Sequence, residues 1–293
     1  MELDKQRAIE ALITPFKEKG QEFIQTFSRF AYQKDLLNPI KDIETQERLA
    51  LLSFMTVLFD SQKESKVHYK EVLELYKKDS NFFTLDNVLA MSEAEAAYFA
   101  RKSMRSMAKK GNYLQTSYQH LKNVYDGSML NVLDNDIIVT QKRLTEFKGI
   151  DVALSGLYVH TVRDHNIFAF SNEDEFCPKV DFHDYNIGRA LGIIKDANPK
   201  KGGAEKTAFS YFLKDLAKEE GVSIFELDAF MWAASQLCVT RNEAICNDYC
   251  PLSKQHNSLR AYSLKNDYSA RSTKAKLQKK IEAAKKLQGK LGF

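Results

Sequence analysis

Apolar residues recur at intervals of three and four along almost the whole of this 293-residue sequence. This spacing places apolar side chains on one face of an α-helix and therefore predicts helices. Proline and glycine, which interrupt helices, number only five and twelve. No alternation is strong enough to predict a strand, although residues 166–170 suit a short extended segment, and the predicted fold class is all-α. Helices are predicted near residues 3–33, 43–60, 64–78, 91–109, 112–124, 138–146, 150–162, 184–195, 204–220, 223–237 and 272–288.

The formal net charge is +4, but it is distributed unevenly. Residues 254–293 contain eleven lysines and arginines and two acidic residues, which gives this tail +9 and leaves −5 for the rest of the chain. A basic tail on a mildly acidic body suits a polyanionic partner. A solvated surface helix rich in lysine has the same composition, so the tail alone does not distinguish the two interpretations.

The composition is that of an ordinary globular protein, with 44% hydrophobic and 28% charged residues. No apolar run approaches the length of about 18 residues that suits a membrane-spanning helix. The first residues, MELDKQRAIEALITPF, mix acidic and basic side chains and lack the apolar core of a signal peptide. We therefore expect a cytoplasmic protein without membrane association, located at the nucleoid in a bacterium or in the nucleus in a eukaryote.

Two stretches of the chain suit ligand binding and chemistry. The first is a turn at residues 148–151 (KGID) between two helical patterns, where Gly149 can adopt the positive φ that a tight turn needs. Backbone N–H groups at the start of the following helix can bind a phosphate oxygen. The second is Asp181, directly before an apolar helical pattern. The alternatives are a plain helix connection at the turn and a helix cap at Asp181.

Together these stretches resemble motifs of the helix-hairpin-helix DNA glycosylases, the endonuclease III superfamily. The family's hairpin motif, L-P-G-[IV]-G-x-K-T-A, is similar to FKGIDVALS at residues 147–155. Its V-D-x-H-[VI]-x-R motif is similar to VDFHDYN at residues 180–186. A third segment, LLSFMTVLFDSQKES at residues 51–65, resembles the family's helix that ends in L-S-x-Q-x-[TS]. The three motifs occur in the family's order, and the resemblance covers roughly residues 45–256.

The resemblance implies a protein that flips a damaged, mispaired or modified base out of double-stranded DNA and hydrolyses its N-glycosidic bond. In the family, the aspartate at the position of Asp181 stabilises the positive charge that develops on the sugar. Gln62 matches the residue that fills the gap left by the flipped base. Members that also cut the strand carry a lysine where this chain has Ala153, which lacks a nucleophile. The prediction is therefore a monofunctional glycosylase that leaves an abasic site.

The motifs also depart from the family pattern. Lys148 replaces the usual proline, Asp151 replaces the second glycine, and Asn186 replaces an arginine. An acidic residue beside a phosphate-binding turn is unfavourable unless it caps the next helix, whereas Lys148 attracts phosphate. His183 has two interpretations, because it can either act beside Asp181 or serve the structure alone. These departures support an alternative function, a catalytically silent helix-hairpin-helix DNA-binding protein.

The resemblance also implies a domain organisation. Residues 45–160 would form a helical barrel domain, and residues 1–44 would join residues 161–256 in a second lobe, with DNA across the cleft between them. Residues 257–293 would form a basic tail that adds salt-dependent affinity. The expected partner is double-stranded DNA, with no small-molecule substrate, and the expected state is a monomer. The residues expected to contact DNA are Gln62, Lys148, Gly149, Ile150, Asp151, His183, Lys274 and Lys276.

Three of the four cysteines lie within thirteen residues, which favours a metal site over disulfides in a chain without a secretion signal. The spacing is Cys238-x7-Cys246-x3-Cys250-x5-His256. The resemblance implies a structural [4Fe–4S] cluster held by three cysteines and one histidine, because many family members carry one on similarly spaced cysteines. Zinc and an empty remnant of the site are the alternatives. An unrelated helical zinc protein is a third possible class.

Overall fold

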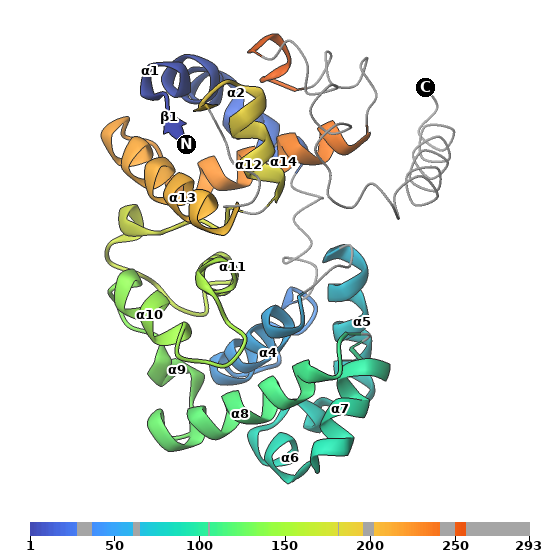
Figure 1. Cartoon of the computed structure of the whole chain (residues 1–293). Coiled ribbons are helices and arrows are strands. Elements are labelled where there is room, and N and C mark those ends of the chain that lie inside the picture. Colours follow the sequence, from blue (N-terminus) through green and yellow to red (C-terminus); the bar gives the residue numbers. More distant parts are fainter. Residues whose placement is uncertain are drawn as a thin grey trace. The chain divides into compact units, whose positions relative to one another are not determined.

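A computed structural model describes residues 1–27, 37–60, 65–104, 106–180, 182–195, 202–240 and 250–255. This part of the chain is mostly helical (Figure 1), as predicted, and its only strands form a two-residue pair. The chain divides into two compact units. Unit 1 comprises Met1–Ser28 and Val180–Phe293, and unit 2 comprises Arg29–Lys179. The division falls after residues 28 and 179, whereas the resemblance placed it near residues 44 and 160.

Unit 1 is built on an aromatic core between its first and last long helices. The ring of Phe230 lies 5.4 Å from that of Phe16 and 5.5 Å from that of Phe23, both edge to face. These contacts join the N-terminal segment to the second part of the unit. Its elements are β1 (Glu2–Leu3), α1 (Lys5–Ala8), a π-helical turn (Ile9–Ile13), α2 (Thr14–Phe27), α12 (Phe182–Ala190), β2 (Ile194–Lys195), α13 (Gly202–Glu219), α14 (Ile224–Thr240) and a 3₁₀ turn (Ser253–Gln255).

Two helix boundaries in unit 1 differ from the sequence prediction. The helix predicted at 184–195 ends at Ala190, because Gly192 adopts a φ of +75° and the chain then forms β2. Strand β2 pairs antiparallel with β1, which the sequence pattern did not indicate. The helix predicted at 3–33 starts at Lys5 and contains a π-helical turn directly before the Thr14-Pro15 step, where proline lacks the N–H of a regular helix.

Unit 2 is organised around α4 (Gln46–Phe59), in which every residue from Leu49 to Phe59 is buried. A helix that is buried on all sides belongs at the centre of a domain. The hydroxyl groups of Ser53 and Thr56 donate to the carbonyls one turn earlier at 2.7 Å, so they enter the core with their hydrogen bonds satisfied. The other elements are α5 (Ser65–Lys78), a 3₁₀ turn (Ser80–Phe83), α6 (Leu85–Ala90), α7 (Glu93–Lys102), α8 (Lys109–Val124), α9 (Met129–Val132), α10 (Ile137–Leu144), α11 (Val152–Asp164) and a 3₁₀ turn (Glu173–Glu175).

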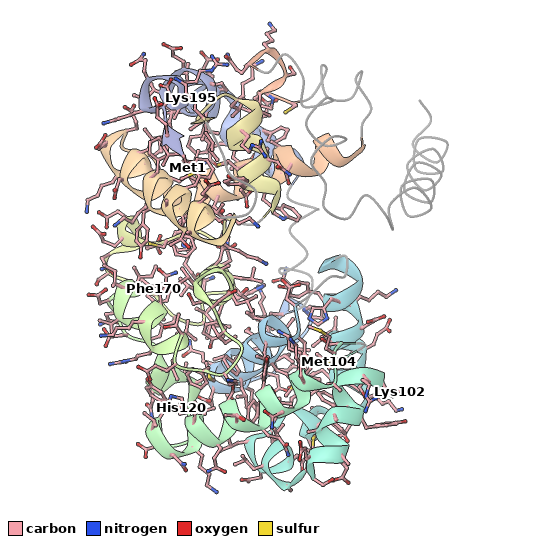
Figure 2. All side chains as sticks on the ribbon, viewed as in Figure 1. Met1, Lys102, Met104, His120, Phe170 and Lys195 are labelled. Carbon is pink, nitrogen blue, oxygen red and sulfur yellow. The ribbon has the colours of Figure 1, made fainter. Side chains whose placement is uncertain are left out.

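The helix predicted at 91–109 is shorter in the structure, because α7 ends at Lys102 and α8 begins only at Lys109. Beyond the end of α7, the N–H of Met104 donates to the carbonyl of Phe99 at 3.0 Å. Met104 is itself buried and is labelled in Figure 2. No glycine or proline marks this break in the sequence, so the helical pattern continued through it. The short helices α6 and α9 were missed for a related reason, since one or two turns carry little periodicity.

We expect unfolding to become easier above pH 10, because Tyr118 and Tyr158 are completely buried. Burial raises the pKa of both phenols well above its usual value, so the folded protein keeps protons that the unfolded chain releases near pH 10. Their stabilising contribution is complete below pH 10 and is lost as the pH rises, by about 1.4 kcal/mol per pH unit for each tyrosine. Burial lowers the pKa of Lys110, so the folded protein loses this proton at a lower pH than the unfolded chain does. The contribution of Lys110 to the unfolding free energy therefore increases as the pH rises toward 10.5, which opposes the effect of the two tyrosines.

Urea unfolding between pH 8 and pH 11 tests this expectation. Tyr118→Phe should reduce the dependence of the unfolding free energy on pH by about 1.4 kcal/mol per unit. At pH 8 the Tyr118→Phe substitution should lower the unfolding free energy only slightly, because the Tyr118 hydroxyl has no hydrogen-bond acceptor among the described residues. Tyr158→Phe should reduce the dependence equally but cost about 1 kcal/mol at pH 8, because its hydroxyl donates to the carbonyl of Ala50 at 3.2 Å. A pH dependence that neither substitution changes would contradict the prediction.

Candidate nucleic-acid interface

The turn predicted from the sequence connects α10 and α11 of unit 2. Gly149 has a φ of +90°, in the left-handed region that favours glycine. Buried and exposed side chains alternate around Gly149. Phe147 and Ile150 are buried, whereas Lys148 and Asp151 are exposed. The N–H of Ile150 donates to the carbonyl of Phe147 at 3.1 Å and closes the turn. The motif therefore forms a tight turn between two helices, with two buried side chains and two exposed ones.

Gly149 is required for a second reason, because the turn lies tightly against α8. A Cβ atom added to Gly149 would be 2.5 Å from Cδ2 of Tyr113, closer than any ordinary carbon contact. The hydroxyl of Ser117 donates to the carbonyl of Lys148 at 3.2 Å and holds the turn on the same helix. The ammonium group of Lys148 lies 5.9 Å from the centre of the Tyr113 ring, where a cation is favoured.

The buried residue Phe147 is in contact with three aromatic rings, one from α4 and two from α8 and the residue that follows it. Its ring lies 5.0 Å from that of Phe54 on α4 and 4.9 Å from that of His120 on α8, both edge to face. The ring of Tyr125, directly after α8, stacks on it at 5.9 Å. His120 is labelled in Figure 2. These contacts fix the hairpin to the central helix, so its exposed groups have a rigid support.

At the start of α11, the acidic residue that departs from the family pattern serves as the helix cap. The carboxylate of Asp151 accepts a hydrogen bond from the N–H of Leu154 at 2.8 Å. This is the condition under which an acidic residue is tolerated beside a phosphate site. Helix geometry leaves the N–H groups of Val152 and Ala153 without an acceptor inside the helix. The positive end of the helix dipole thus remains available to an anion.

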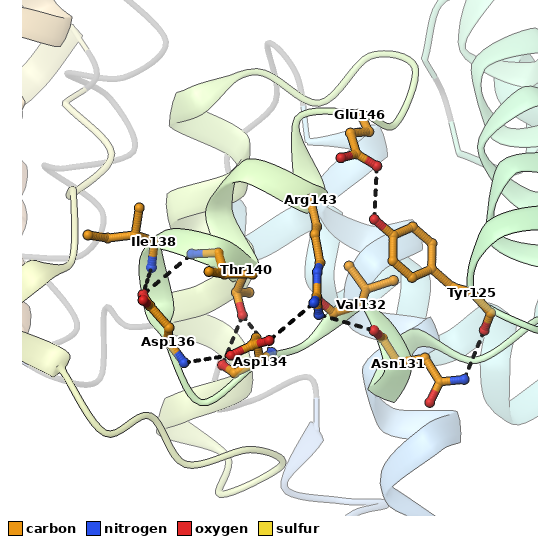
Figure 3. A network of polar contacts seen from close by, with 10 residues as sticks. Tyr125, Asn131, Val132, Asp134, Asp136, Ile138, Thr140, Arg143 and Glu146 are labelled. Atoms are coloured by element: carbon orange, nitrogen blue, oxygen red, sulfur yellow. Dashed lines mark hydrogen bonds and ion pairs between the residues drawn. The ribbon is translucent and has the colours of Figure 1, made fainter.

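The first turn of α10 is held by a polar network in the preceding loop (Figure 3). The carboxylate of Asp136 caps the helix by accepting from the N–H of Ile138 at 2.8 Å. The side-chain amide of Asn172 and then the Ile138 N–H hold the pKa of Asp136 below its usual value. The hydroxyl of Thr140 accepts a hydrogen bond from the N–H of Asp134 at 2.8 Å and donates one to the carbonyl of Asp134 at 3.0 Å.

The last turn of α10 and the residues before the hairpin are braced in the same network (Figure 3). Arg143 pairs with Asp134 at 3.1 Å and donates to the carbonyl of Asn131 at 3.4 Å. The hydroxyl of Tyr125 donates to the carboxylate of Glu146 at 2.8 Å. Burial and this hydrogen bond raise the pKa of Tyr125 to about 12. Both ends of α10 are therefore held in place.

The end of α4 also approaches the hairpin, because a Cβ atom on Gly149 would lie 3.3 Å from Cδ1 of Leu58. The N–H of Asp60 donates to the carbonyl of Val57 at 3.0 Å and ends the helix. Lys110, only 7% exposed, donates from Nζ to the carbonyl of Leu58 at 2.6 Å. Burial lowers the pKa of Lys110, while the nearby carboxylates of Asp60 and Asp151 oppose that shift. Gln62, predicted to fill the gap in DNA, follows two positions later and lies outside the described residues.

The segment that leads to Asp181 crosses α11 in close contact. A Cβ atom on Gly156 would lie 3.0 Å from the carbonyl oxygen of Cys177 and 3.2 Å from the nitrogen of Lys179. The side-chain amide of Gln141 makes two hydrogen bonds with the backbone of Cys177, donating to its carbonyl at 3.1 Å and accepting from its N–H at 3.2 Å. Gln141, Gly156 and Lys179 were not singled out from the sequence, because their partners lie far away along the chain.

In unit 1, α12 begins at Phe182, directly after Asp181. Asp181 lies outside the described residues, as does the side chain of His183, so catalysis and capping both stay predictions. Asp184 is buried on α12, at the position where the motif that this segment resembles has valine or isoleucine. Tyr185 is also buried, and its hydroxyl donates to the buried carboxylate of Glu205 on α13. Sequence reasoning missed these two acidic residues, because burial of a charged side chain leaves no pattern.

The far end of α12 is joined to the 3₁₀ turn at Ser253–Gln255, which lies between Cys250 and His256 of the cysteine motif. Arg7 donates from Nε to the carbonyl of Leu191 at 2.7 Å and from Nη2 to the carbonyl of Gln255 at 2.6 Å. Cys250, whose carbonyl accepts a hydrogen bond from the N–H of Ser253 at 3.0 Å, is only 3% exposed. The N-terminal segment therefore connects the helix that follows Asp181 with the segment that follows Cys250.

Of the four predicted metal ligands, only Cys250 has a described side chain. Cys238 lies on α14 with its side chain outside the described residues, as are Cys246 and His256 entirely. Within the parts of the chain that the structure describes, no three His, Cys, Asp or Glu residues are grouped as metal ligands. The predicted DNA contacts Lys274 and Lys276 also lie outside the described residues. The proposed ligand set therefore rests on sequence spacing and on the chemistry of thiolate and imidazole donors.

No protein-family model matches this sequence, and no curated protein matches it significantly. Among the helices of the described ranges, none is both long and apolar enough to cross a membrane.

Proposed function

We propose that this protein binds double-stranded DNA through the hairpin at residues 147–151 and hydrolyses the N-glycosidic bond of a damaged, mispaired or modified base. The observation that carries the proposal is the conformation of Gly149, which has a φ of +90° in a turn between two helices. Phe147 and Ile150 on either side of it are buried and hold the turn in place. This conformation agrees with the local sequence motif, and Lys148 is exposed beside it. The expected product is an abasic site in an intact strand.

The hairpin suits a phosphate group by its charge as well as by its shape. The N–H groups of Val152 and Ala153 supply donors at the positive end of α11. Lys148 adds an exposed cation beside them. The negative charge of Asp151 is directed to the N–H of Leu154, which limits its repulsion of phosphate. Such contacts position DNA without reading its sequence.

The chemical step is assigned to Asp181, whose carboxylate would stabilise the positive charge on the sugar as the base departs. Ala153 occupies the position of the lysine that forms a Schiff base in related enzymes, which favours hydrolysis without strand cleavage. Gln62 would fill the space of the flipped base, and His183 would act beside Asp181 or contact phosphate. Extruding a base costs a few kcal/mol of stacking and pairing energy, and a side chain that fills the vacated space recovers part of that energy.

A catalytically silent DNA-binding protein is the second candidate. It is favoured by the replacement of residues at four motif positions, namely Asp151, Ala153, Asn186 and His256, the last of which stands in place of a cysteine. Such a protein would retain the hairpin and bind duplex DNA but release no base. The two candidates differ in their product, so one assay separates them.

The cysteine motif is proposed to hold a structural [4Fe–4S] cluster through Cys238, Cys246, Cys250 and His256, with zinc as the alternative ion. Such a site would stabilise unit 1 and take no part in the chemical step. Iron, sulfide and zinc analysis of the purified protein distinguishes these cases from a site without metal. The basic residues Lys274 and Lys276 are proposed to add salt-dependent affinity for DNA.

The function is tested with duplexes that carry a panel of damaged and naturally modified bases. Released base is detected directly, and strand breaks are scored with and without alkali. Release of a base with breaks only after alkali supports the monofunctional glycosylase. Binding without release across the panel favours the silent DNA-binding protein. Breaks without alkali would show that a lysine elsewhere supplies the strand-cutting step.

Lys148→Ala is expected to weaken binding to duplexes of every sequence. A plot of log affinity against log salt concentration falls with a slope whose magnitude increases by about one for each phosphate that a lysine neutralises. The magnitude of this slope should therefore be smaller by about one in the Lys148→Ala variant. Fluorescence anisotropy at several salt concentrations measures it. Lys77→Ala, at an exposed position on α5 of the same unit, is the matched control and should retain the wild-type slope. Equal slopes for both variants would contradict the assignment of Lys148.

A further inference from the structure

An aromatic ring on α8 lies directly beside the hairpin of unit 2 and has an exposed lysine on either side. A Cβ atom on Gly149 would be 2.5 Å from Cδ2 of Tyr113, and the ammonium group of Lys148 lies 5.9 Å from the centre of the same ring. Lys109 is exposed one helical turn before Tyr113. Side chains four positions apart lie on the same side of a helix, with their Cβ atoms about 5–6 Å apart. Lys109 and Lys148, called the flanking lysines below, therefore approach Tyr113 from its own helix and from the hairpin.

The charged residues behind the flanking lysines leave this part of unit 2 positive. Burial lowers the pKa of Lys110, and the carboxylates of Asp60 and Asp151 partly offset that shift, so both acids lie near this lysine. Each carboxylate is also engaged elsewhere, because Asp60 pairs with Lys179 at 3.2 Å and Asp151 accepts from the N–H of Leu154 at 2.8 Å. With the flanking lysines included, the group has four lysines and two aspartates, so its positive charge exceeds its negative charge by two. Such a group suits a polyanion.

The contacts of Tyr113 suit the support of Lys148 better than stacking on a base. One edge of the ring lies against Gly149, and the ammonium group of Lys148 lies within the range of a cation–π interaction. A base that stacked on an aromatic ring would need an open face. A lysine side chain that the ring already restrains loses less conformational entropy when it binds a phosphate. The ring therefore favours the bound conformation of Lys148.

We propose that Lys109 contacts the phosphate backbone of duplex DNA together with Lys148, and that Tyr113 is a positioning residue that holds Lys148 in place. This inference rests on the DNA binding proposed for the hairpin and extends that surface onto α8. Lysines bind phosphate as point charges, so the contribution of Lys109 should be independent of base sequence. The contribution of Tyr113 should depend on the presence of Lys148.

The role of Lys109 is tested with the full-length protein and an undamaged duplex, by fluorescence anisotropy at several salt concentrations. Lys109→Ala should reduce the magnitude of the slope of log affinity against log salt concentration by about one, and Lys109→Ala with Lys148→Ala should reduce it by about two. Lys122→Ala is the matched control on the same helix. Lys122 is exposed and follows Tyr113 by nine positions, about two and a half turns, so it lies on the opposite side of α8. The control should retain the wild-type slope.

The role of Tyr113 is tested by comparing two substitutions in the same assay. Tyr113→Phe keeps the ring and should bind as the wild type does. Tyr113→Leu removes the ring and should weaken binding about two- to fivefold, the effect of a cation–π interaction at an exposed site. In a protein that already carries Lys148→Ala, Tyr113→Leu should change the affinity no further, because the ring acts through that lysine. Urea unfolding of each variant measures any loss of stability separately.

The possible outcomes separate the inference from the proposed function. If Lys148→Ala reduces the slope and Lys109→Ala does not, the extension onto α8 is wrong and the hairpin assignment stands. If Tyr113→Leu weakens binding equally with and without Lys148, or if Tyr113→Phe weakens binding as much as Tyr113→Leu does, Tyr113 is not a positioning residue for this lysine. If the wild type binds no duplex at any salt concentration, the DNA-binding function and this inference fail together.

Discussion

Asp181→Asn is expected to reduce the single-turnover rate of base release by about 10²–10⁴-fold, because asparagine keeps the size of the side chain and removes its charge. The carboxylate is assigned to the sugar on which positive charge develops, and a neutral amide cannot provide the same stabilisation. Asparagine caps a helix about as well as aspartate, so the stability of α12 should be retained. The substitution therefore separates catalysis from capping at this position.

Asp181→Ala provides the complementary measurement, because alanine removes both the charge and the capacity to cap. If Asp181 only caps α12, Asp181→Ala should lower the unfolding free energy by about 1 kcal/mol, whereas Asp181→Asn should not. Both variants should then release the base at the wild-type rate. If Asp181 is catalytic, both variants lose that rate. Direct detection of released base, together with urea unfolding of each variant, distinguishes these results. Full activity in Asp181→Asn would remove Asp181 from the chemical step.

Gly111→Ala is expected to destabilise unit 2 by about 3 kcal/mol or more, although alanine normally stabilises a helix by about 0.5–1 kcal/mol relative to glycine. Gly111 lies in the first turn of α8 and is buried against α7. A Cβ atom there would lie 2.2 Å from the carbonyl oxygen of Ala96 and 2.4 Å from its carbonyl carbon. Both atoms belong to the helix backbone and cannot rotate away, so α7 and α8 would have to separate.

Urea unfolding monitored by circular dichroism measures the effect of Gly111→Ala. Gly203→Ala is the matched control, because Gly203 lies in the first turn of α13 with no heavy atom within 4 Å of the added Cβ. The control should leave stability unchanged or slightly raised. A Gly111→Ala protein as stable as the wild type would show that α7 and α8 tolerate a wider separation than this structure has.

The sequence by itself determined the features that depend on neighbouring residues. The three- and four-residue spacing predicted the long helices, including α4, α5, α11 and α14, within a few residues of their ends. Gly149 was identified as the turn residue because no other residue type adopts its positive φ at so little cost. The capping condition for Asp151 was also stated from local chemistry, and the structure meets it.

Only the tertiary structure decided the features that depend on residues far apart in the chain. The pairing of β1 with β2 ended the helix predicted at 184–195, and backbone contact made Gly111 indispensable to the packing of α7 on α8. The ion pair between Asp60 and Lys179 spans 119 positions and has no local pattern. The physical reason is that periodicity and turn preference act within a few residues, whereas close packing and half-buried charge pairs exist only after the elements have assembled.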